Sequence, residues 1–160
     1  METIKMNTVL IALDYNPTDQ KIAEVGFSLA KAMNAKIILL HVFLTPVDYS
    51  SVAYEPIMGF AGFSNLDAYQ QNTEILSKTA LDFLDNVKKH LGDSSIETLV
   101  KEGEYAETIL ETANLYKADI IVIGSHSKKW LEKIVMGSTT EKILHDTNIP
   151  LLIIPTKKKQ

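Results

Sequence analysis

Two glycines and a cluster of hydroxyl side chains mark the stretch from residue 124 to residue 144, GSHSKKWLEKIVMGSTTEKIL. Gly124 directly follows the apolar run ADIIVI, and Gly137 opens the sequence GSTT. Glycine lets backbone N–H groups approach a phosphate closely, because it carries no Cβ. GSTT also begins a helix pattern, and the N-terminus of a helix favours an anion. The chemistry that this pattern indicates is the binding of phosphate groups.

Each residue of this pattern also has a purely structural interpretation. Ser138 and Glu141 have the spacing of a capping box, which stabilises a helix start without any ligand. Gly137 fits the end of the preceding helical turn, KKWLEKIVM. His126 stands between two serines, where it could contact a phosphate or a ligand ring, and a solvent-facing loop position explains it equally well. Both interpretations stay open at this point.

The bulk properties predict a single soluble domain spanning residues 1–160. Apolar residues make up 46% of the 160 residues, and no cysteine is present for a disulfide, an iron–sulfur cluster or a thiol nucleophile. The net charge of −4 argues against a nucleic-acid surface, and the basic tail at 157–160 is interpreted as solvated. The start, METIKMNTVLIALD, lacks the apolar stretch of a signal peptide, so we expect a cytoplasmic protein that does not contact the membrane.

Four short, continuous apolar runs are the elements that must position the phosphate pattern: TVLIALD (8–14), KIILLHV (36–42), ADIIVIG (118–124) and PLLIIPT (150–156). Continuous runs are typical of parallel strands that are covered on both faces. A weaker, alternating run at 95–103 predicts a strand toward an edge. Helix patterns separate the runs, so the order predicts an α/β fold with a parallel sheet and helices on both faces.

The helix boundaries also follow from sequence signals. Asn16 and Pro17 predict an N-cap and first helical position, and Ser64 predicts the start of a second helix whose buried stripe includes Leu76. Between the second strand and this helix, residues 44–63 form a long apolar loop. We interpret it either as a flap over a ligand or partner, or as a locally packed loop.

The expected place for a ligand is the crevice beyond the carboxyl ends of the strands, where the strand order reverses. If the first and fourth strands are the central neighbours, Asp14 and Gly124 face each other across this crevice. The GSTT sequence then adds a helix N-terminus to it.

With these motifs in place, the chain resembles the universal stress proteins over nearly its whole length. The ATP-binding branch of that family carries G-x2-G-x9-G-[ST] between the fourth strand and the final helix. Gly124, Ser127, Gly137 and Ser138 reproduce this spacing, and VLIALD, ILLHV and ADIIVIGSH are similar to family signatures. The resemblance implies an open five-stranded, Rossmann-like sheet of order 3-2-1-4-5. It also implies a homodimer formed through the last strand, which begins at Pro150 and ends at Thr156.

The resemblance further implies roles for individual residues in an adenine-nucleotide site. Asp14 would accept hydrogen bonds from the ribose or adenine region, while Ala12 and Val42 would contact the base. The ribose and phosphates would lie against the set Gly124, His126, Ser127, Gly137, Ser138, Thr139 and Thr140. ATP is the expected cofactor, with Mg²⁺ or Mn²⁺ carried on its phosphates.

Ser127 departs from the family pattern, because it replaces the middle glycine. A serine keeps the backbone N–H and adds a hydroxyl donor, so binding fails only if this position requires a positive φ or no Cβ. We therefore expect a nucleotide-binding regulatory protein of the stress response. The alternative is a dimeric interaction protein whose phosphate loop binds no nucleotide.

An enzyme is the least favoured interpretation. The sequence has no G-x4-G-K-[ST] loop, and Asp14 would lie at the nucleoside end of the ligand rather than at the γ-phosphate. We expect binding with at most slow ATP hydrolysis. An adenylyl transferase of the wider adenine-nucleotide α-hydrolase-like group would need further catalytic motifs. The sequence does not distinguish ATP from AMP or a cyclic nucleotide.

Overall fold

A five-stranded sheet forms the centre of the computed structural model, which describes residues 1–44, 62–125 and 137–156, with the side chains of 62–69 excepted. The strands are β1 (Thr8–Leu13), β2 (Lys36–Phe43), β3 (Glu97–Glu102), β4 (Ile120–Ser125) and β5 (Leu151–Pro155). All neighbours pair in parallel, in the order β3-β2-β1-β4-β5. The predicted α/β fold and strand order are therefore confirmed, and the strand from the alternating run lies at one edge.

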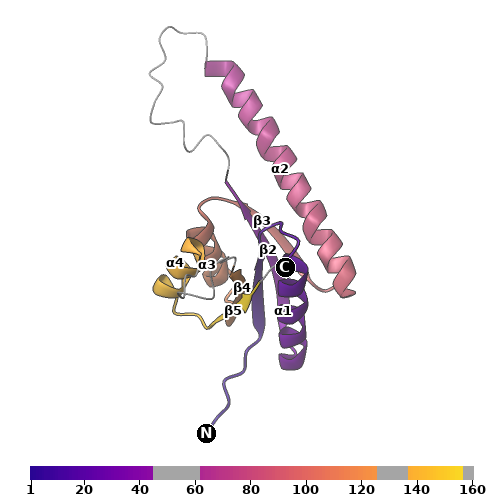
Figure 1. The fold of residues 1–160 in the computed structure, drawn as a ribbon, viewed down its shortest axis with the longest axis vertical. Coiled ribbons are helices and arrows are strands. Elements are labelled where there is room, and N and C mark those ends of the chain that lie inside the picture. Colours follow the sequence, from indigo (N-terminus) through magenta and orange to yellow (C-terminus); the bar gives the residue numbers. More distant parts are fainter. Residues whose placement is uncertain (45–61, 126–136, 157–160) are drawn as a thin grey trace.

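Helices cover both faces of this sheet. They are α1 (Asp19–Met33), α2 (Gly62–Leu91), α3 (Tyr105–Leu115) and α4 (Ser138–Asp146). In Figure 1, α1 and α2 lie on one side of the strands, and α3 and α4 lie on the other. The continuous apolar runs follow from this arrangement, because both faces of the central strands are buried.

Each face of the sheet has its own hydrophobic core, and alternate residues of one strand enter different cores. Val9 and Ile11 of β1 pack with Ile22 of α1 and Leu84 of α2. Leu10 of β1 packs on the opposite face, in a cluster with residues of α3 and α4 that include Ala106, Ile109 and Ile143. This two-sided burial explains why β1 and β2 carry almost no polar residue before their carboxyl ends.

The start of α1 differs from the prediction. The helix begins at Asp19 rather than beside Asn16, and Pro17 precedes it. The Asn16 side chain accepts a hydrogen bond from the Thr18 backbone N–H at 3.3 Å, and the Asn16 carbonyl accepts one from Asp19 N at 2.9 Å. An additional turn therefore separates β1 from α1.

Helix α2 begins at Gly62, two residues before the predicted start at Ser64. Figure 1 shows that its first half extends beyond the sheet. Leu76 is accordingly 40% exposed, and the prediction that it belongs to the buried stripe is wrong. The long loop predicted at 44–63 falls mostly on residues 45–61, which lie outside the described ranges, as does the tail at 157–160.

The turn from α2 into β3 is held by the carboxylate of Asp93. Lys31 Nζ of α1 donates to Asp93 Oδ2 at 2.8 Å, and Ser95 N donates to Oδ1 at 2.9 Å. These hydrogen bonds, with that from Lys31 the strongest cause, hold the pKa of the Asp93 carboxyl well below its usual range. Within the described ranges, no helix combines the length and apolar character that crossing a membrane requires.

Candidate nucleotide site

A pocket of about 280 Å³ opens at the carboxyl ends of β1 and β4. This volume is near the lower end of the range for small-molecule sites, roughly 300–1,000 Å³. The strand order reverses between β1 and β4, because β1 connects onward to β2 on one side while β4 connects to β5 on the other. The pocket therefore lies at the switch point where open α/β sheets bind ligands.

Eight of the ten residues predicted for the nucleotide site line this one pocket: Ala12, Asp14, Val42, Gly124, Gly137, Ser138, Thr139 and Thr140. They come from the ends of three strands and from the first turn of α4, up to 128 positions apart in the chain (140 − 12). The remaining two, His126 and Ser127, lie outside the described residues.

Gly124 in β4 has a packing role that is independent of any ligand. A Cβ at this position would lie 3.1 Å from Ile22 Cγ1, closer still to Ile22 Cδ1, and 3.3 Å from Thr156 Cγ2. Real Cβ atoms rarely make contacts this short, so glycine allows α1 to pack directly against β4. This close approach sets the width of the pocket at the β4 side.

Gly137 is in a different situation. Its φ of −59° and ψ of 153° are open to any residue, and a Cβ there would meet no described atom within 4 Å. Gly137 is the N-cap of α4, and its carbonyl accepts from Glu141 N at 3.0 Å. No packing contact in the described part of the chain requires this glycine.

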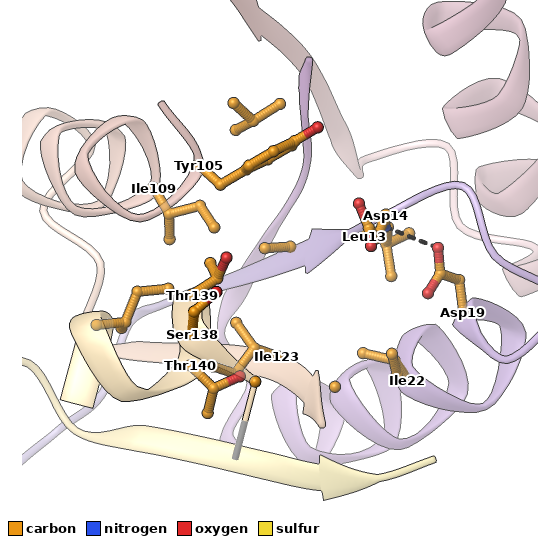
Figure 2. A pocket seen from close by; sticks show the side chains of 15 residues that line it. Leu13, Asp14, Asp19, Ile22, Tyr105, Ile109, Ile123, Ser138, Thr139 and Thr140 are labelled. Atoms are coloured by element: carbon orange, nitrogen blue, oxygen red, sulfur yellow. Dashed lines mark hydrogen bonds between the residues drawn. The ribbon is translucent and has the colours of Figure 1, made fainter. Parts of the chain in front are cut away.

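The first turn of α4 presents polar groups to the pocket. Ser138 is the first helical residue rather than the N-cap, and the helix start has no side-chain cap, so the predicted Ser138–Glu141 capping box is wrong. The first N–H groups of a helix have no partner within the helix, and the helix dipole makes this end positive. Figure 2 shows the side chains of Ser138, Thr139 and Thr140 at this turn. The arrangement can bind an anion.

Asp14 lies at the opposite end of the pocket, immediately after β1 (Figure 2). Its backbone N–H donates to Oδ2 of Asp19 at 2.7 Å, and the next residue, Tyr15, has a left-handed φ of 57°. The Asp14 side chain is exposed to solvent at the pocket, and a carboxylate oxygen can accept more than one hydrogen bond.

The carbonyl of Leu13, the last residue of β1, is also held by a side chain. His41 of β2 is buried, and its Nδ1 lies 2.8 Å from Leu13 O. Because a carbonyl can only accept, Nδ1 must carry the proton. The His41 ring also packs edge-on to Phe83 of α2, with centroids 6.2 Å apart. His41 is therefore a buried residue whose ring nitrogen Nδ1 has a hydrogen-bond partner.

Seven lining residues were not among the predicted ones: Leu13, Asp19, Ile22, Tyr105, Ile109, Ile123 and Ile143. Most of them give the pocket an apolar wall. Tyr105 and Ile109 come from the first two turns of α3, and Figure 2 shows the Tyr105 hydroxyl directed toward the Asp14 end. Ile109 is both buried in the core and part of the pocket wall. Tyr105 and Ala106 at the start of α3, shortly after the end of β3, could have indicated this wall.

The position of α4 relative to α3 is supported by an ion pair. Glu104 is the N-cap of α3, where its Oε2 accepts from Glu107 N at 2.9 Å and from Lys142 Nζ of α4 at 3.2 Å. The Glu107 N–H is the main cause that lowers the pKa of Glu104, and Lys142 acts in the same direction. In the described part of the chain, no group of three or more His, Asp or Glu side chains is placed to hold a metal ion.

Comparisons with known proteins match this fold and this chain over nearly their whole length. The profile of the Universal stress protein family matches residues 5–155. Universal stress protein MJ0531 of Methanocaldococcus jannaschii is 28% identical over 154 residues, which cover 95% of this chain and 84% of that protein. Universal stress protein MJ0577 of the same organism is 29% identical over 150 residues, covering 88% and 93%.

Solved structures give the same result. The structure of MJ0577 superimposes with a TM-score of 0.70 at 26% identity, covering 98% of this chain and 100% of that one. A universal stress protein in complex with cAMP (TM-score 0.60, 19% identity, coverage 96% and 100%) shares the fold. So does the Archaeoglobus fulgidus protein in complex with dAMP (TM-score 0.58, 15% identity, coverage 94% and 99%). The chain belongs to the universal stress protein family.

Proposed function

We propose that this protein is a regulatory protein of the stress response that binds an adenine nucleotide, ATP, in the pocket at the ends of β1 and β4. The observation that carries the proposal is the convergence of residues from three separate segments on one pocket. Asp14, Val42 and the turn from Gly137 to Thr140 are distant in sequence, yet all of them line it. A family motif without a binding role would not need this arrangement.

Different regions of the pocket suit the phosphates, the base and the ribose of a nucleotide. The N-terminus of α4 and the hydroxyls of Ser138 and Thr139 suit the phosphates. The apolar wall near Val42 suits the flat face of adenine, and the carboxylate of Asp14 suits the ribose hydroxyls. The complexes of two family members with cAMP and dAMP support an adenine nucleotide as the ligand class.

We expect binding without efficient turnover. Asp14 lies at the far end of the pocket from the first turn of α4, so it is not placed to orient a water toward the γ-phosphate. We expect Mg²⁺ or Mn²⁺ to be held through the phosphates of ATP. At most slow hydrolysis follows from this arrangement.

A homodimer formed through β5 is part of the same proposal. Strand β5 is the last strand of the sheet order, and its residues Leu151, Leu152 and Ile153 are only half-buried. An open strand edge of this kind is a ready template for pairing with a second copy. Light scattering coupled to size-exclusion chromatography should give twice the 17.8 kDa mass of the chain.

A thermal-shift titration of protein stripped of bound nucleotide tests the proposed function. At about 100 times its dissociation constant, a ligand stabilises the fold by roughly 2.7 kcal/mol. For a domain of this size, that corresponds to a rise in Tm of about 5–11 °C. ATP with Mg²⁺, ADP, AMP and cAMP are compared with GTP, which we expect to bind more weakly because it presents different groups to the base pocket.

Two variants of Gly137 test whether the ATP-induced shift in Tm comes from binding at the N-terminus of α4. Gly137→Glu adds a carboxylate beside the anion site, and Gly137→Gln adds a side chain of nearly the same size without the charge. Because a Cβ at Gly137 would meet no described atom within 4 Å, both variants should fold. We expect a far smaller ATP shift in Gly137→Glu than in Gly137→Gln. No shift with any nucleotide at millimolar concentration would overturn the proposal and favour the interaction protein with a non-binding loop.

A further inference from the structure

The first residue of α1, Asp19, holds the turn that carries Asp14. The Asp19 side chain is almost fully buried, with 1% of its surface exposed. Its Oδ2 accepts hydrogen bonds from two backbone N–H groups, those of Asp14 at 2.7 Å and Asn16 at 2.8 Å. The first of these is the dashed line in Figure 2. These two donors flank Tyr15, so one carboxylate oxygen closes the turn on both sides of that residue.

The turn has a backbone conformation that its sequence does not favour. Tyr15 has a φ of 57°, in the left-handed region that bulky side chains rarely adopt. Such a conformation persists only where the surrounding structure imposes it. The two hydrogen bonds to Asp19 impose it from one side. On the other side, the Tyr15 ring packs edge-on to Phe83, with centroids 4.8 Å apart.

The consequence of this turn lies in the pocket. Strand β1 ends at Leu13, and the turn begins one residue later, so the orientation of Asp14 depends on the backbone that Asp19 holds. Without these hydrogen bonds, the Asp14 N–H loses its partner, and the positive φ of Tyr15 is less strongly stabilised. The Asp14 side chain would then sample several directions instead of the one at the pocket.

We propose that Asp19 is a positioning residue, which fixes the Asp14 carboxylate for hydrogen bonds with the ribose hydroxyls of the nucleotide. This inference rests on the proposed function and names the determinant of its selectivity for a ribose with free 2′ and 3′ hydroxyls. Asp19 acts through the backbone of the turn, and Asp14 makes the contact.

The test is the ratio of the dissociation constants for 2′,3′-dideoxy-ATP and ATP, measured by calorimetry in the presence of Mg²⁺. Hydrogen bonds to a charged group make the wild-type ratio about tenfold or more. Asp14→Ala should bring this ratio to nearly one. Asp19→Ala should bring it below about threefold while Asp14 is still present. Asp19→Asn should keep a ratio close to that of the wild type, because its Oδ1 can accept both N–H groups.

A matched control separates positioning from general loss of stability. Asp93 also holds a turn through hydrogen bonds to its carboxylate, but it lies just after the C-terminal end of α2 and does not line the pocket. Asp93→Ala should therefore leave the ratio unchanged even where it lowers Tm. If Asp19→Ala does not fold, Asp19→Ser replaces it. Serine keeps a single, shorter acceptor, so its ratio should fall between those of Asp14→Ala and the wild type.

The outcomes distinguish this inference from the proposed function. If the wild type binds neither nucleotide, both are overturned. If the wild type binds ATP but shows no preference over the dideoxy nucleotide, only the inference is overturned. The same holds if Asp14→Ala loses the preference while Asp19→Ala and Asp19→Ser retain it fully. Loss in Asp19→Ala with retention in Asp19→Asn and Asp93→Ala is the result we expect.

Discussion

Alanine at Gly124 should destabilise the fold, whereas alanine at Gly137 should leave its stability nearly unchanged, although both glycines belong to one motif. At Gly124, the new Cβ would lie 3.1 Å from Ile22 Cγ1 and closer to Cδ1. Ile22 is 1% exposed, and both its Cγ1 and its Cδ1 must shift to admit the new Cβ. Overpacking of this kind typically costs about 1–3 kcal/mol.

At Gly137, the same substitution meets open space, and its φ of −59° and ψ of 153° suit alanine. Replacing glycine where the backbone is already compatible stabilises a protein by about 0.4–1 kcal/mol, because the unfolded chain loses freedom. For a domain of this size, each kcal/mol corresponds to roughly 2–4 °C in Tm. At this N-cap, alanine is less favourable than glycine by a comparable amount, so the two effects largely offset each other. Gly124→Ala should therefore lower Tm by about 2–12 °C, and Gly137→Ala should change it by less than about 2 °C.

Urea denaturation of nucleotide-free protein, followed by circular dichroism, measures both changes without a contribution from bound ligand. The slope of the unfolding free energy against urea should be the same in the wild type and both variants, so that midpoints can be compared directly. Equal shifts in the two variants, or a larger loss in Gly137→Ala, would refute the assignment of a packing role to one glycine and a ligand-facing role to the other.

Three further predictions concern the residues that hold the ends of the elements. His41→Leu should cost about 1–3 kcal/mol in urea denaturation, because the buried Leu13 carbonyl loses its donor, and a loss below about 0.5 kcal/mol would contradict the hydrogen bond. The pKa of Asp93 is lowered in the folded state, so the stabilisation by its carboxylate is present above the ordinary pKa of 3.8 and is lost as pH falls below that value. The difference in Tm between wild type and Asp93→Ala should therefore be present at pH 7 and shrink below about pH 4. A difference that stays constant with pH would contradict this. Glu104→Ala should cost about 1 kcal/mol by urea denaturation, because the α3 N-cap is lost. Glu111→Ala, on the exposed face of the same helix, should change stability by less than about 0.5 kcal/mol. Equal effects of the two substitutions would argue against the cap.

The strands and the position of the pocket could be predicted from the sequence because they depend on local composition and on a general property of parallel sheets. A strand covered on both faces must be largely apolar, and β1 and β2 show this in their central residues. Once the sheet is parallel, its ligand site lies at the carboxyl ends of the strands. The family motif then assigned residues to the site, and eight of them line one pocket.

The errors have both local and long-range causes. The start of α1 is displaced because Asp19 accepts hydrogen bonds from the N–H groups of Asp14 and Asn16 in the turn after β1, a pattern that the helix-cap rules do not include. Leu76 has the spacing of a core residue, but its half of α2 extends beyond the sheet, and its side chain is 40% exposed. Tyr105 was missed because the wall it forms depends on how α3 packs beside β1 and β2.

The most direct test of the account is the crystal structure of the protein grown with ATP and Mg²⁺. The account predicts the phosphates at the N–H groups of Ser138 and Thr139, the adenine against the wall near Val42, and the ribose hydroxyls within hydrogen-bond distance of Asp14. An ordered nucleotide at any other surface would contradict it. So would an empty pocket at nucleotide concentrations of several millimolar, with crystal contacts that leave the pocket open.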